Sequence, residues 1–403
     1  MRFKPLAATL SVLAISGFLT LLGTAAYSSY LDQQIARMPF NKNAVQKYEN
    51  EVRDKGQALF EQELGRKDIM ILGSSELEIQ VPEHPNYMFP NAQAPWQVCP
   101  GGRAYAQSLH QAIHLGSFPK EKLKDAKIVL ITSLQWFSSP EIIGAGQLAR
   151  FSELQYYKTL NNQNLDLGTR RYLAHRMAQF MVGNELFSRA LFYSRLFISD
   201  QWQDKLTLWL LKPYYAGMIK YLEIKDKYQY LALLKHTPLP EKLDPVPPKQ
   251  INFAAAYAKA EQEGKLSCTN NKFYVEDAYF DRWLKPNLDW VKGKSADTEL
   301  LHSKEWEDLE VLMKVCRDNG IKLYVVFMST NGYYYDYTGI TKKARSDFYK
   351  QQAAVMKKYG VPYLNLEDKE YVPYFYYDVM HLGWKGWLYF DEQLTKHFGK
   401  AAG

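Results

Sequence analysis

The sequence predicts an α/β fold with three layers, in which helices cover both faces of a mostly parallel central sheet. Three short apolar runs predict strands, at Ile69–Leu72, Ile128–Ile131 and Leu323–Met328. A continuous apolar run of this length is typical of a strand that is buried on both faces. Helical patterns separate these runs, and strands that alternate with helices indicate βαβ units.

Two helix-strand units follow each other in the carboxyl-terminal part. The first helix carries one apolar stripe, formed by Trp306, Leu309, Met313 and Cys316. We expect this helix to end at Asn319-Gly320, just before the third strand. The second helix runs from about Lys342 to Tyr359, ends at Gly360 and leads into a fourth strand at 361–365. A glycine after the last helical residue is a common stop signal.

The amino-terminal segment predicts a membrane anchor. Leu6–Ala26 contains no charge, and 21 helical residues span about 31 Å, the thickness of the hydrocarbon layer. Arg2 and Lys4 precede the run, so we expect a cytoplasmic amino terminus and an extracytoplasmic main domain, held at the cell membrane by a single pass. The alternative is a cleaved signal peptide, with Thr24-Ala25-Ala26 as the cleavage site.

The organisation that we predict has three parts. Residues 1–31 form the cytoplasmic tip and the anchor, 32–66 form a connecting helical segment, and 67–403 form the extracytoplasmic domain. A helical insertion at about 141–300 interrupts that domain between the second and third strands. Five prolines mark a stiff, extended connection within it: Pro238, Pro240, Pro245, Pro247 and Pro248.

Composition excludes several classes of protein. The chain has 403 residues, 47% hydrophobic and 23% charged, which is too long for a small disulfide scaffold and too apolar for disorder. A net charge of +7 without a concentrated basic run argues against nucleic acid and suits an anionic polymer or an ordinary surface. Three cysteines exclude a disulfide framework; they are Cys99, Cys268 and Cys316.

Two motifs could carry chemistry. Gly73-Ser74-Ser75-Glu76 follows the first predicted strand, where a serine hydroxyl lies at the carboxyl edge of the sheet. The alternative is that one of the serines only caps the next helix. Asp378 precedes His381 by three residues, a spacing that lets the carboxylate orient the imidazole as a base. A histidine with a merely local partner is the alternative there.

Together the two motifs resemble the SGNH (GDSL-type) hydrolase superfamily, and within it the DltD family. The family resemblance also rests on the amino-terminal anchor and on Gln107-Ser108-Leu109, Gln135-Trp136-Phe137, Asn331-Gly332, Tyr335–Gly339 and Asp378–Trp387. It implies Ser75 as nucleophile, His381 as base and Asp378 as orienting carboxylate. By position it implies that Gly102 and Gln135 complete the oxyanion hole. The glycine-poor stretch after Gly102 departs from the family pattern.

Aromatic side chains around these motifs predict a hydrophobic wall. We expect Trp136, Tyr377 and Trp384 to bind substrate and to exclude water, although such residues can equally face the core. No metal or cofactor is expected. His110 and His114 share a helical face but lack a third ligand nearby, and the sequence has no phosphate loop or dinucleotide fingerprint.

The resemblance implies a membrane-anchored serine acyltransferase that helps to transfer D-alanine as an ester onto teichoic acid, including lipoteichoic acid. It also implies partners: a membrane-bound O-acyltransferase, a D-alanyl carrier protein and the anionic polymer. Two alternatives stay open. One is an acetyltransferase or esterase that acts on an exported polysaccharide, and the other is a non-enzymatic protein that binds a polymer or carrier.

Overall fold

The computed structural model describes residues 3–39, 41–46, 50–65, 68–79, 81–89, 97–124, 126–239 and 251–399. At its centre lies a five-stranded parallel sheet with the order β2-β1-β3-β4-β5. The strands are β1 (Ile69–Leu72), β2 (Val98–Gly101), β3 (Lys127–Ser133), β4 (Leu323–Met328) and β5 (Tyr363–Asn365). The predicted α/β class with a parallel sheet is therefore confirmed.

The strand order reverses between β1 and β3. The chain runs from β1 outward to β2 and then returns to the other side of β1, where Ile69 pairs with Lys127. In open parallel sheets a crevice forms at the carboxyl ends of the two strands that flank such a reversal. The exits of β1 and β3 are therefore the place where this fold positions a site.

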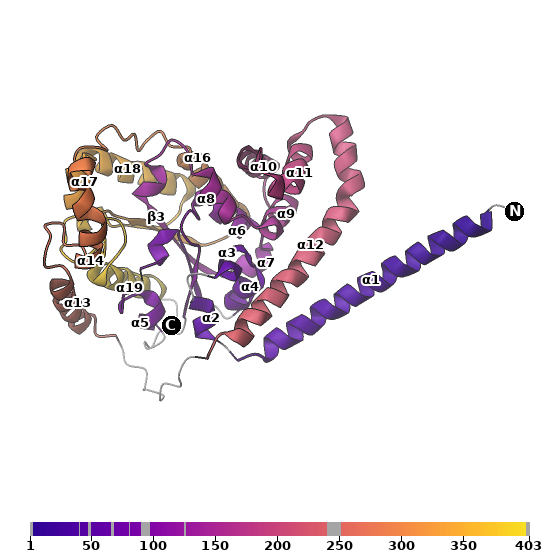
Figure 1. Cartoon of the computed structure of the whole chain (residues 1–403), viewed down its shortest axis with the longest axis horizontal. Coiled ribbons are helices and arrows are strands. Elements are labelled where there is room, and N and C mark those ends of the chain that lie inside the picture. The colour runs from indigo at the N-terminus through magenta and orange to yellow at the C-terminus, as the bar shows by residue number, and fades with distance from the viewer. Residues whose placement is uncertain are drawn as a thin grey trace.

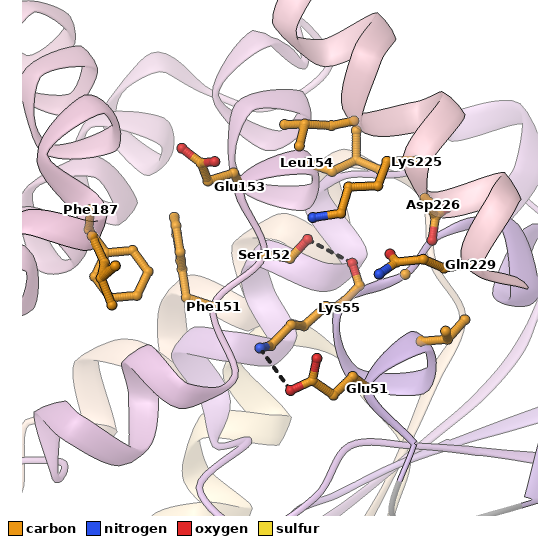
Figure 2. Close-up of a pocket in the computed structure, with 14 residues that line it drawn as sticks. Glu51, Lys55, Phe151, Ser152, Glu153, Leu154, Phe187, Lys225, Asp226 and Gln229 are labelled. Atoms are coloured by element: carbon orange, nitrogen blue, oxygen red, sulfur yellow. Dashed lines mark hydrogen bonds and ion pairs between the residues drawn. The ribbon is translucent and has the colours of Figure 1, made fainter.

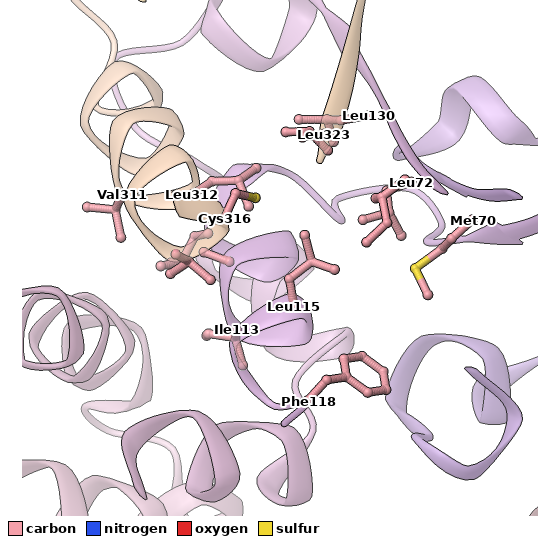
Figure 3. Close-up of a cluster of buried hydrophobic side chains, with 14 of the residues drawn as sticks. Met70, Leu72, Ile113, Leu115, Phe118, Leu130, Val311, Leu312, Cys316 and Leu323 are labelled. Carbon is pink, nitrogen blue, oxygen red and sulfur yellow. The ribbon is translucent and has the colours of Figure 1, made fainter. Parts of the chain in front are cut away.

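Helices cover both faces of the sheet, because side chains along each strand alternate between two apolar interiors. Met70 and Leu72 enter one interior, whereas Ile69 and Ile71 enter the other. Figure 3 shows the first interior, where strand side chains meet Leu115 and other helical residues. Its helices include α4 (Ala58–Gly65), α6 (Ser108–Gly116), α16 (Glu305–Asp318) and α18 (Lys342–Tyr359). Helices of the other interior include α13 (Phe253–Ser267) and α19 (Trp384–Phe398).

One strand, β2, has no counterpart among the sequence predictions. It has four residues and contains Pro100, which lacks the backbone N–H that a strand between two neighbours would donate. The proline is tolerated because β2 lies at the edge of the sheet, where one side of the strand has no neighbour.

Helices fill the chain between β3 and β4. In the described residues, the α-helices there are α8 (Gly144–Ala149), α9 (Glu153–Asn161), α10 (Leu167–Met181), α11 (Ser188–Ile198), α12 (Trp202–His236), α13, α14 (Asp277–Tyr279), α15 (Leu288–Val291) and α16. The range 141–300 supplies helices to both sides of the sheet, since α9 packs on α6 whereas α13 packs on α19. Pro238 precedes the gap at 240–250, and the other four prolines of the expected connection lie outside the described residues.

The amino-terminal helix α1 (Phe3–Arg37) projects from the domain and contacts α12 near its own carboxyl end (Figure 1). Leu31 and Ile35 are buried there. Within the described residues, no helix combines the length and the apolar character needed to cross a membrane. Five short helices complete the described part of the fold: α2 (Lys42–Gln46), α3 (Glu51–Lys55), α5 (Pro85–Met88), α7 (Lys120–Leu123) and α17 (Gly332–Thr338).

Candidate active site

Ser75 lies where β1 leaves the sheet. After β1 the chain passes Gly73 and Ser74 and enters a short 3-10 helix at Ser75–Leu77. Ser74 occupies the position before this helix, but its side chain makes no capping hydrogen bond. The Ser75 hydroxyl is half-buried and lies 3.0 Å from Nε2 of His381.

Asp378 holds His381 in place through two sets of contacts. Oδ1 of Asp378 accepts the backbone N–H groups of Met380 and His381, each at 2.8 Å, and so shapes the turn between them. Oδ2 lies 2.7 Å from Nδ1 of the His381 ring. Because the carboxylate only accepts, Nδ1 carries the proton and Nε2 faces Ser75 as an acceptor. The structure thus brings Ser75, His381 and Asp378 into one hydrogen-bonded chain across 306 positions of sequence.

Burial and charge act in opposite directions on His381. Burial disfavours the imidazolium, but the carboxylate of Asp378 and the more distant Glu76 and Glu78 outweigh it, so the pKa of His381 is raised above its ordinary value. An imidazole with a raised pKa is a stronger base toward a serine hydroxyl.

Glu76 directly follows Ser75 in the chain, and its carboxyl group is buried. No role was predicted for it. One oxygen accepts the Ser74 N–H at 2.6 Å, and the other accepts the Trp136 indole N–H at 2.9 Å. Burial raises the pKa of Glu76, although these hydrogen bonds and His381 oppose the shift. Glu76 thus ties the exit of β1 to the exit of β3. The sequence signal for Glu76 was its position directly after Ser75.

A cavity of about 310 Å³ lies beside Ser75 at the reversal of the strand order. Its lining includes Ser75, Tyr105, Gln107, Gln135, Trp136 and Ile143. Nε2 of Gln135 is buried and lies near the Tyr335 hydroxyl, but it makes no hydrogen bond of ordinary geometry with the described residues. An amide N–H beside a nucleophile can donate to an oxyanion, so the geometry suits the role expected for Gln135.

Gly102 lies next to Gly73 and is not part of the cavity lining. Its φ of 109° is in the left-handed region, and a Cβ there would lie 2.1 Å from the Gly73 carbonyl oxygen. The position therefore needs glycine so that the exits of β1 and β2 can approach each other. Its expected part in the oxyanion hole stays a prediction.

The three aromatic residues expected to bind substrate differ in exposure. Trp136 and Trp384 are buried, at 4% and 5% exposure, whereas Tyr377 is half-buried. Trp136 lines the cavity, and the ring of Trp384 packs on Tyr377 with centroids 5.6 Å apart. Only Trp136 of the three therefore faces the space next to Ser75.

A buried ion pair between Arg345 and Glu370 holds the segment that leads to Asp378. This pair was not predicted. Nε and Nη2 of Arg345 donate to the two carboxylate oxygens of Glu370, both at 2.9 Å, and Nη1 reaches Asp336 at 2.9 Å. The backbone adds a further tie, since the Asn331 N–H donates to the Val379 carbonyl. No local pattern signals this arrangement, because the partners lie on separate elements.

Other candidate sites lie apart from this one. A cavity of about 280 Å³ beside α3, α9 and α12 contains none of the predicted site residues (Figure 2). Burial lowers the pKa of His110 to about 3 and that of His114 to about 4, so both are neutral core residues. Among the described residues, no group of three or more histidine, cysteine or acidic side chains is placed to hold a metal ion.

Comparison with known proteins adds independent findings. A family model described as "DltD protein" matches residues 46–399. A protein named DltD from Bacillus subtilis (strain 168) is 30% identical over 350 residues, which cover 85% of this chain and 86% of that protein. Another protein named DltD, from Staphylococcus aureus (strain NCTC 8325 / PS 47), is 29% identical over 81% of this chain and 80% of its own. A third, from Lacticaseibacillus rhamnosus, is 23% identical over 84% and 79%.

Proposed function

The chain belongs to the DltD protein family, and from that premise we propose that it takes part in esterifying teichoic acid with D-alanine, as an extracytoplasmic serine acyltransferase. The observation that carries the proposal is the hydrogen-bonded chain of Ser75, His381 and Asp378 next to a cavity. An alcohol, a base and an orienting carboxylate are the parts that acyl transfer through a serine ester requires.

In the first step, the Ser75 hydroxyl attacks the carbonyl carbon of an activated D-alanyl ester or thioester. Nε2 of His381 takes the serine proton as the new C–O bond forms, and Asp378 stabilises the imidazolium. The bond to the donor then breaks, and the imidazolium returns its proton to the leaving oxygen or sulfur. The product is a D-alanyl ester on Ser75.

In the second step, a hydroxyl group of the polyol-phosphate polymer replaces the donor. His381 takes its proton while the hydroxyl oxygen attacks the acyl carbon, and the bond to Ser75 then breaks as Oγ regains a proton. The amide of Gln135, with a contribution expected from Gly102, stabilises the oxyanion in both steps. The side chain of Trp136, which lines the cavity, keeps water from competing with the polymer.

We place the protein at the cell membrane, with residues 1–31 as a single-pass anchor and the main domain outside the cytoplasm. Support comes from the uncharged run Leu6–Ala26 and from the projection of α1 away from the domain (Figure 1). The family premise supports a membrane-bound O-acyltransferase and a D-alanyl carrier protein as partners.

The proposal is tested by trapping the acyl group. The full chain is incubated with a D-alanyl thioester, quenched in acid, digested and analysed by mass spectrometry. The peptide that contains Ser75 should gain the mass of one alanyl group, and His381→Ala should abolish this gain. Ser74→Ala is the matched control and should leave it intact.

Analysis of the cell envelope separates the alternatives. Cells that carry only Ser75→Ala should lose ester-linked alanine from teichoic acid and keep ester-linked acetate. Loss of acetate with unchanged alanine would instead identify an acetyltransferase. No adduct on Ser75 together with unchanged esters would identify a binding protein.

The activity should depend on pH through His381. The base must be neutral to accept the serine proton, so the rate should rise with pH through the raised pKa of His381. Asp378→Asn removes the charge that raises this pKa, and we expect the acidic limb of the rate profile to move to lower pH. The maximal rate should also fall, by about 10³ to 10⁴-fold.

The profile of initial rate against pH checks this prediction, with Asp368→Asn as the control. Asp368 is an exposed carboxylate of the same segment and is not among the main influences on the pKa of His381, so its loss should leave the acidic limb in place. If the acidic limb of the Asp378→Asn variant lay at the same pH as that of the parent chain, a group other than His381 would control the rate.

A further inference from the structure

The amino-terminal half of α12 carries an exposed apolar surface that the acyl-transfer site does not use. Trp202, Leu206, Trp209, Leu210 and Tyr214 form this surface, which we call the α12 aromatic face. The exposed fractions of Trp202 and Trp209 are both 68%, and that of Leu210 is 61%. Contiguous apolar side chains this exposed usually mark a contact surface.

The opposite side of the same half-helix is also apolar. Leu208, Leu211, Tyr215, Met218 and Leu222 are buried or half-buried against the first interior of the domain. A helix with apolar side chains on both sides is expected to be covered on both sides. In the described part of the chain only one side of this half-helix is covered.

The carboxyl-terminal half of α12 is fixed to the domain and to α1. Asp226 accepts the backbone N–H groups of Gln57 and Ala58, at 3.0 and 2.7 Å, just before α4 begins; its side chain appears in Figure 2. Nζ of Lys227 lies 2.8 Å from Asp32 and 2.9 Å from Ser28, both in α1. The direction of α12 is therefore set relative to the domain.

Figure 1 shows that α1 and α12 project on the same side of the molecule from neighbouring ends. On α1, apolar side chains including Ile15, Phe18, Leu19 and Leu22 are exposed by half or more. The α12 aromatic face thus lies on the side from which the expected anchor leaves the domain.

The chemistry of this region fits a lipid surface. Tryptophan and tyrosine are enriched where a membrane meets water, because their rings are apolar and their N–H or O–H groups remain hydrated. Residues 186–222 carry five basic side chains and two acidic ones, and three of the basic ones form ion pairs: Arg189 with Glu153, Lys205 with Asp200 and Lys220 with Glu223. Basic residues beside such a surface are attracted to anionic lipid headgroups.

We propose that the α12 aromatic face rests in the headgroup region of an anionic lipid bilayer, as a second membrane contact beside the anchor. This proposal rests on the anchoring part of the proposed function. Two membrane contacts on separate helices fix the orientation of the domain, whereas a single anchor would leave the domain free to rotate about the axis of the anchor. The cavity beside Ser75 is then held at a constant height above the membrane.

The test uses the full chain in proteoliposomes that contain anionic lipid and nitroxide-labelled lipid. Single cysteines are introduced by Trp209→Cys, Trp290→Cys and Leu19→Cys and are labelled with an environment-sensitive fluorophore. The three native cysteines are buried, so labelling is selective for the new thiol. Trp290 is the matched control, because its exposure of 67% is close to the 68% of Trp209 and because it lies on another helix, α15.

We expect the label at Trp209 to be quenched several-fold more strongly than the label at Trp290, and its quenching to weaken at high salt. If the label at Leu19 is quenched and the label at Trp209 is not, the proposed contact of α12 with the membrane is wrong, whereas the proposed anchor is supported. If neither label is quenched, both the proposed anchor and the proposed contact of α12 are wrong. Leu210→Cys repeats the measurement should the Trp209 variant not fold.

Two other results would also overturn the proposal. Protection of the Trp209 label only in the presence of a membrane-bound acyltransferase would identify a protein as the occupant. Cross-linking between Trp209→Cys copies in detergent would identify a second copy of the chain.

Discussion

Replacing Ser75 by alanine should lower the rate of D-alanyl transfer by about 10⁴ to 10⁶-fold, the range found when a serine nucleophile is removed. The expected loss is large because Oγ of Ser75 is the atom to which the acyl group is attached, and because no other hydroxyl of the described residues makes a hydrogen bond with the His381 ring. The measurement is the initial rate at which the full chain forms ester-linked alanine on a polyol-phosphate acceptor.

Two further variants make this prediction specific. Ser74→Ala should retain activity within about tenfold, since the Ser74 side chain makes no capping bond and the contact to His381 belongs to Ser75. The double variant Ser75→Ala/His381→Ala should be no slower than Ser75→Ala alone, because the two groups act as one unit. If Ser75→Ala kept nearly full activity, the acyl-serine mechanism would be wrong.

Replacing Arg345 by methionine should have the largest effect on stability. The guanidinium is fully buried and pairs with both oxygens of Glu370, which is 2% exposed. Methionine leaves the Glu370 carboxylate buried without its partner, and the loss of one partner from such a pair costs about 3–5 kcal/mol. Denaturant unfolding of the variant and the parent chain measures the change in the free energy of unfolding.

The same helix provides the control. Lys343 pairs with Asp347 at 2.6 Å but is 86% exposed, so Lys343→Ala should cost about 1 kcal/mol or less. The double variant Arg345→Met/Glu370→Leu should recover part of the stability, because it removes the unpaired carboxylate as well. Equal losses of stability for Arg345→Met and Lys343→Ala would contradict this account of the buried Arg345–Glu370 pair.

Much of the sheet and the candidate triad could be predicted because their signals are local. The apolar runs at Ile69–Leu72 and Leu323–Met328 form the strands expected of them, since a strand buried on both faces must be apolar throughout. Asp378 and His381 share one turn, so their three-residue spacing already suggested a pair. Ser75 was a candidate because it follows a predicted strand.

Tertiary structure alone decided the contacts between distant segments. Arg345 and Glu370 read as ordinary surface charges in sequence, and only the fold removes them from water and makes them partners. Glu76 and Trp136 lie 60 residues apart, and β2 is recognisable only once the sheet shows that Pro100 lies on an edge. Hydrophobic patterning depends on near neighbours in the chain, whereas desolvation of a charge depends on everything that surrounds it in space, which a linear pattern does not contain.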